Sequence, residues 1–310
     1  MTGHVRQAVG WHRPLMVFAG LMVVTGLVAG GGLLVDDRVL GGEAIWLKPL
    51  KFSVSLGVYA LTWAWLLSLR PQRPWMWWAS TAIAGLAGVE MVIIVGQVLR
   101  GRASHFNIAS PLDSTLFTIM GVAITALWVL NMAQGAVLLR ERLPDRAVEW
   151  AVRLGIVIGS VGIGLAFLMV GPGPDNLPDR VGAHSVGVPD GGPGMPVTGW
   201  STVGGDLRIP HFVGIHAMQA LPLLALALSA AARRLPRLAE EGVRVRLVWL
   251  AGGLYAGTVA VVTWQALRGQ PLLRPDAWTL GALGLLVVAA VAGAARALST
   301  SERREPVLAA

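Results

Sequence analysis

Eight long apolar stretches constrain the fold of this chain more than any other feature of its sequence. They run roughly over residues 14–35, 52–69, 75–99, 111–139, 150–170, 210–232, 247–267 and 278–298. A helix needs about 20 consecutive apolar residues to cross the hydrocarbon core of a bilayer. The stretches are continuously apolar, whereas the strands of a membrane β-barrel alternate. The sequence therefore predicts an all-α polytopic bundle of about eight transmembrane helices.

Composition narrows the class further. Of the 310 residues, 55% are hydrophobic and 14% are charged, whereas a soluble domain carries about 25% charged residues. We expect residues 1–310 to form a single transmembrane domain. The chain has no cysteine, which excludes disulfides, thiolate metal sites and thiol nucleophiles. The first stretch is too long for the apolar core of a signal peptide, so we expect it to be retained as a helix.

The distribution of basic residues predicts the orientation. With a cytoplasmic N-terminus, 16 of the 25 Lys and Arg residues fall on the cytoplasmic side and 9 fall outside. Because the excess belongs in the cytoplasm, we expect both termini to be cytoplasmic. The net charge of +8 then reflects topology, and no basic stripe indicates nucleic acid as a partner. The Ala-, Gly- and Arg-rich composition favours a multi-pass protein of a bacterial inner (plasma) membrane.

One connection is unusually long. Residues 171–208 hold six prolines and many glycines, so this segment does not form a helix. In the predicted orientation it is an extracytoplasmic loop. A loop of this length is either functional or a connector, so we consider both a lid over a site and a solvated link.

Polar residues within or beside the apolar stretches indicate a site near the outer surface. Glu90 lies about fifteen residues into the third stretch, and a carboxyl group in hydrocarbon is costly enough to suggest function. The alternative is a protonated Glu90 that bonds to a neighbouring helix. Gln97 lies seven residues further and therefore on the same helix face. This face leads toward the polar loop that contains His105.

Three histidines extend the predicted site. His105 follows the third stretch, and His211 and His216 lie at the start of the sixth. Imidazole suits zinc, iron, copper and haem, so we predict His105, His211, His216 and Glu90 as metal ligands, with Glu90 and His216 as catalytic residues. On a helix, His211 and His216 are about 140° apart and do not form the i, i+4 pair of a helical zinc motif. His216 and Gln219 share a face.

Cations predict the rim of the same site. We expect cofactor or ligand contacts from a group of basic and amide side chains, namely Lys48, Lys51, Arg102, Gln219 and Arg268. Arg268 follows Trp264 by four residues, so the two side chains are expected to stack. The group suits an anion such as a phosphate, a carboxylate or a haem propionate. The alternative is contact with membrane lipid phosphates.

Three functions fit these patterns. The first is a metal- or haem-dependent membrane enzyme, an oxidoreductase or hydrolase, that acts on a lipid-like or quinone-like substrate. The second is a transporter or receptor for a small anionic or lipid-like ligand, although no internal repeat indicates an inverted-repeat transporter. The third is a non-catalytic accessory protein of the membrane. The sequence does not fix the metal, the substrate or the oligomeric state.

Overall fold

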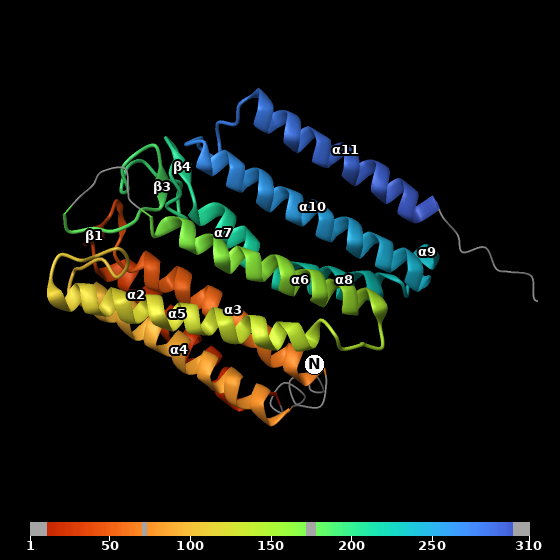
Figure 1. Ribbon diagram of the computed structural model, residues 1–310, viewed down its shortest axis with the longest axis horizontal. Helices are drawn as coiled ribbons and strands as arrows, with labels where there is room; N and C mark the ends of the chain where they lie inside the picture. The colour runs from red at the N-terminus through yellow and green to blue at the C-terminus, as the bar shows by residue number, and fades with distance from the viewer. Residues whose placement is uncertain (1–10, 70–72, 172–177, 300–310) are drawn as a thin grey trace, which may run out of the picture.

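A computed structural model describes residues 11–69, 73–171 and 178–299 (Figure 1). Its helices are α2 Arg13–Val35, α3 Leu47–Ser68, α4 Pro74–Leu99, α5 Pro111–Leu138, α6 Arg146–Gly164 with the 3-10 turn η1 Leu165–Met169, α7 Arg208–Ile215, α8 Ala217–Ala231, α9 Pro236–Ala239, α10 Glu241–Leu267 and α11 Ala277–Ser299. Within the described ranges, seven helices are each long and apolar enough to span a membrane, and α7 with α8 makes an eighth if the bent pair is counted as one span. The predicted all-α polytopic bundle is confirmed. The ends of the chain, on which the predicted cytoplasmic termini fall, lie outside the described residues.

Several helices begin earlier than hydropathy predicts. α3 begins at Leu47, α6 at Arg146 and α10 at Glu241, about one turn or more before the apolar stretches. These first turns carry charges, so hydropathy does not detect them, although Asp145 caps α6 by accepting hydrogen bonds from two backbone N–H groups. As a result, Lys48 and Lys51 belong to the first turns of α3.

The sixth predicted helix is broken. α7 ends at Ile215 and α8 begins at Ala217, with a bend of 40° between them. Pro222 lies inside α8 and has no N–H for the carbonyl four residues before it, which favours a bend in the preceding turn. On the other side of the break, Gly214 packs against Gly162 of α6 so closely that a Cβ on Gly162 would lie 2.3 Å from the Gly214 carbonyl carbon. The break places His216 between two helix axes.

The helices form two halves. Helices α2 to α5 pack mainly on one another, as do α6 to α11, and the halves meet chiefly where α5 packs on α6 and α3 packs on α8. In Figure 1 the first half runs from red to yellow and the second from green to blue. Each half has its own helix packing, so the groups at the junction are positioned by both.

Short strands and loops cover one end of the bundle, which we call the capped end. The hairpin of β1 (Val39–Leu40) and β2 (Glu43–Ala44) turns through Gly41 and Gly42, both with positive φ, as tight hairpin turns require. Beside it, β3 (Ser185–Val186) pairs with β4 (Gly205–Asp206). The Pro/Gly-rich segment contains no helix in its described part, 178–207; residues 172–177 lie outside the described ranges.

Candidate functional site

Side chains from both halves converge on Lys48 at the capped end. The Lys48 ammonium lies 3.1 Å from His105 Nδ1, and Ser104 Oγ lies 3.1 Å from the same nitrogen. Phe52, one turn after Lys48, packs its ring edgewise against His105. Burial, with the charges of Lys48 and two further histidines, holds the pKa of His105 well below its usual range. His105 is therefore a neutral acceptor for Lys48.

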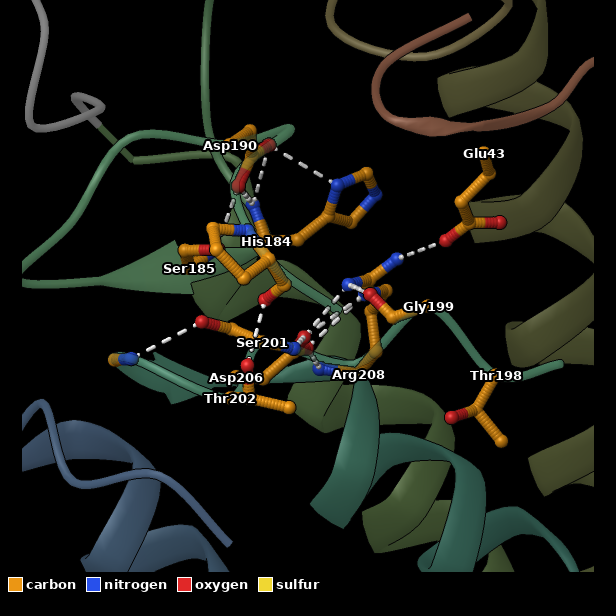
Figure 2. Close-up of polar contacts among 12 residues, drawn as sticks. Glu43, His184, Ser185, Asp190, Thr198, Gly199, Ser201, Thr202, Asp206 and Arg208 are labelled. Carbon is orange, nitrogen blue, oxygen red and sulfur yellow. Dashed lines mark hydrogen bonds and ion pairs between the residues drawn. The ribbon is translucent and has the colours of Figure 1, made fainter. Parts of the chain in front are cut away.

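His184 is the second imidazole of the group. Its Nδ1 lies 3.0 Å from Asp190 Oδ2, and the backbone N–H groups of His184 and Ser185 also donate to this carboxylate (Figure 2). Burial lowers the pKa of His184, although Asp190 opposes the shift. For Asp190, burial raises the pKa, but the hydrogen bond and charge of His184, together with the backbone N–H groups of His184 and Ser185, outweigh burial and hold the pKa below its usual range. The neutral ring donates from Nδ1 and presents Nε2 as an acceptor.

Four charged residues form what we call the ionic clasp, namely Lys51, Glu43, Arg208 and Asp206. Glu43 accepts from Lys51 at 2.6 Å and from Arg208 at 3.3 Å. Arg208 also forms a forked pair with Asp206, with a shortest distance of 2.6 Å, as Figure 2 shows. The clasp thus ties β2 and α3 of the first half to β4 and α7 of the second.

Two more histidines lie on α7 and at its end. His211 Nδ1 lies 2.7 Å from the carbonyl oxygen of Gly162, so it donates to that oxygen. His216 Nδ1 lies 3.2 Å from Gln219 Oε1, and Gln219 Nε2 donates to Thr62 Oγ1 of α3 at 3.1 Å. The predicted shared face of His216 and Gln219 is thus a direct contact that links α8 to α3.

Glu90 is the buried carboxyl group of α4. Its side chain is enclosed, with the residue 5% exposed, and Oε1 has no hydrogen-bond partner among the described residues. Lys48 is the charged residue with which Glu90 interacts electrostatically. Gln97, on the same face, bonds to Asp113 and to the carbonyl of Ala103, so it serves the loop after α4.

The predicted site residues divide into two groups. Lys48, Glu90, His105, His211, His216 and Gln219 lie on the segments that meet at this junction. The other three predicted cations do not contribute a free charge to it: Lys51 is held in the clasp, Arg102 is exposed, and Arg268 pairs with Asp276. The expected stacking of Arg268 on Trp264 is confirmed, with 4.4 Å from the guanidinium carbon to the ring centroid.

The described residues do not support the predicted metal centre. Within the described residues, no three His, Asp or Glu side chains are arranged to hold a metal ion. Sequence reasoning also missed His184, Glu43 and the pairing of Arg208 with Asp206. The spacing Asp206-x-Arg208 before a helix was a local signal for the last of these. Nothing local identified His184, because its partners come from a non-periodic segment.

Comparisons with protein-family models, with curated proteins and with solved structures give no match. The function is therefore argued from the geometry alone.

Proposed function

We propose that the capped end binds the anionic group of a small lipid-soluble molecule, as a receptor or carrier does. The observation that carries this proposal is the state of Lys48. In the described ranges of the chain, no carboxylate lies within ion-pair distance of its ammonium group. Its hydrogen-bond partner is the neutral ring of His105. Lys48 is thus an enclosed amine that has no carboxylate partner among the described residues, and an anionic ligand group would hold it in its charged form.

Charge balance around Lys48 favours an anionic ligand. Glu43 and Glu90 favour the charged form of Lys48 from beyond ion-pair distance, whereas the cations Lys51 and Arg208 disfavour it. The clasp has two positive and two negative members, so it offers no surplus negative charge. A buried charge without a partner is costly. A carboxylate or phosphate of a ligand would supply the missing partner.

Space for such a group is inferred from the burial of the lining residues. Lys48, His105, His184 and His211 are surrounded by protein, and each still keeps some accessible surface. A ligand group can therefore reach these side chains from their accessible side. Phe52 supplies an apolar wall beside Lys48. The ligand we propose therefore has a polar head and an apolar body.

The distribution of Lys and Arg residues along the chain predicts the side of the membrane from which the ligand enters. With 16 of 25 Lys and Arg residues on the other side, the positive-inside rule places the capped end outside the cytoplasm. We propose that the ligand comes from the outer leaflet or the space beyond it. A purely structural accessory role gives no reason for the unpaired Lys48.

Ligand titration tests this function. Purified protein in nanodiscs of neutral phosphatidylcholine is titrated with radiolabelled palmitate, hexadecyl phosphate and methyl palmitate, which lacks the charge. We expect both anionic probes to bind at least about tenfold more tightly than the ester, because a hydrogen bond to a charged group contributes about 1.5–3 kcal/mol. In Lys48→Met this preference disappears, and in Lys48→Arg it is partly kept.

Arg268→Gln is the matched control, since it removes a cation at the capped end that already has a carboxylate partner. Its preference for the anionic probes stays at the wild-type value. Equal binding of palmitate and its methyl ester by the wild-type protein contradicts the proposal. An equal loss in Lys48→Met and Arg268→Gln would point to general surface charge and also contradicts it.

A further inference from the structure

We propose that His216 accepts a hydrogen bond from the hydroxyl group of a lipid-soluble ligand at the break between α7 and α8. This inference goes beyond the proposed function, because it places a second polar contact deeper in the bundle and with a different chemistry. It rests on which nitrogen of the His216 ring carries the proton. Three hydrogen bonds decide that question.

A relay of side chains fixes the ring. Thr62 Oγ1 donates its single proton to the carbonyl oxygen of Val58 at 2.8 Å, so it accepts from Gln219. The NH₂ end of the Gln219 amide therefore faces Thr62, at 3.1 Å, and its oxygen faces His216 Nδ1, at 3.2 Å. An amide oxygen only accepts hydrogen bonds, so His216 Nδ1 carries the proton. In a neutral ring, Nε2 is then a bare lone pair.

The lone pair has no partner. His216 Nε2 is buried and makes no hydrogen bond with the described part of the chain. His216 lies eight residues beyond the start of α7 at Arg208, which is about 12 Å along the helix and within the apolar span. A buried acceptor without a partner costs about 1–3 kcal/mol. A ligand hydroxyl would remove this cost.

Neighbouring groups define the ligand further. Phe212 packs its ring against that of His216 at 4.5 Å. A hydroxyl on an aromatic ring would donate to His216 Nε2, and the ring would pack on Phe212. The ligand class is therefore a lipid-soluble phenol or a similar ring alcohol.

His12 shows the contrast. It is also a buried histidine, but its Nδ1 accepts from the backbone N–H of Leu15 and its Nε2 donates to the carbonyl of Trp77. Both nitrogens are used within the protein, so His12 has a structural role. His216 uses only one. This difference makes His12 the matched control.

The test compares two probes that differ by one proton donor, 4-dodecylphenol and its methyl ether, 4-dodecylanisole. We expect wild-type protein in neutral nanodiscs to bind the phenol about tenfold more tightly, which corresponds to about 1.4 kcal/mol. His216→Phe keeps an aromatic ring without the acceptor and loses the preference. His12→Phe keeps it. Arg268→Gln, at the capped end, also keeps it. Because the two proposals use different probes, a failure of this proposal is distinguishable from a failure of the anion site.

A second measurement does not depend on a variant that folds. The ¹⁵N chemical shifts of labelled histidine report rings with a protonated Nδ1 and a bare Nε2, the state assigned to His184, His211 and His216. We expect 4-dodecylphenol, but not the anisole, to move the Nε2 signal of one of these rings. Equal affinities of the wild-type protein for the two probes would overturn the proposal. So would a preference that persists in folded His216→Phe.

Discussion

At the scale of the residue, hydrogen-bond partners give similar side chains different roles. His105 accepts at Nδ1 from Lys48, whereas His184 donates from Nδ1 to Asp190. Both rings are neutral because burial lowers their pKa values. Cations differ in the same way, since Arg208 has two carboxylate partners and Lys48 has none in the part of the chain that the structure describes. The site is thus defined by unsatisfied groups rather than by residue types.

Asp206 gives a prediction about the clasp. Its carboxylate is fully buried, with 0% side-chain exposure, and it receives Arg208 together with the backbone N–H of Ser201. Asp206→Asn removes the charge that Arg208 faces, so we expect the free energy of unfolding to fall by about 3 kcal/mol. Unfolding in mixed micelles, followed by circular dichroism, measures it. Asp276→Asn breaks an exposed pair with Arg268 and changes stability little; equal losses in both variants would refute the assigned role.

Some site residues were predictable from the sequence and others were not. Glu90 and Lys48 were found because a charge inside or beside an apolar stretch is rare and costly. His184 was not, because its position depends on Asp190 and on strand pairing in a segment without periodicity. The metal prediction counted imidazoles and a carboxylate. It did not contain the distances that decide whether three ligands meet.

At the scale of the element, hydropathy predicted the helices but not their ends or the break. Apolar length determines what crosses the membrane, so all eight stretches were found. Hydropathy does not detect helix turns that carry charges, such as the first turn of α3. The break at His216 comes from Gly214, Gly162 and Pro222, which involve packing between helices as well as local sequence.

The contact of α6 with α7 gives the prediction at this scale. A Cβ on Gly162 would lie 2.3 Å from backbone atoms of Gly214, so Gly162→Ala forces the two helices apart. We expect the free energy of unfolding to fall by about 2 kcal/mol. Gly164→Ala is the matched control on the same helix, because its Cβ would meet only the Trp128 side chain at 3.4 Å. Unfolding in mixed micelles compares them, and an unaffected Gly162→Ala protein would show that this contact does not hold the helices together.

At the scale of the whole molecule, the two halves are joined at the capped end by polar and aromatic contacts as well as by the helix packing deeper in the bundle. Glu43 and Arg208 form an ion pair across the junction, and the backbones of Asn107 and Arg180 form an antiparallel β-bridge there. Phe106 also packs on His184 across it, at 4.9 Å. Deeper in the bundle, Gln219 and Thr62 make a lighter contact. These contacts cover the capped end beside Lys48.

The side of the membrane that the capped end faces is the last prediction. The chain has no cysteine, so single cysteines are unambiguous reporters. Val203 is exposed at the capped end and Leu235 is exposed between α8 and α9. Because most Lys and Arg residues lie on the side of Leu235, we expect a membrane-impermeant maleimide to label Val203→Cys, but not Leu235→Cys, in intact spheroplasts. In permeabilised spheroplasts the maleimide labels both variants. The cysteine-free parent protein is labelled in neither preparation. The reverse pattern would place the Lys48 site in the cytoplasmic half, and its ligand would then come from inside the cell.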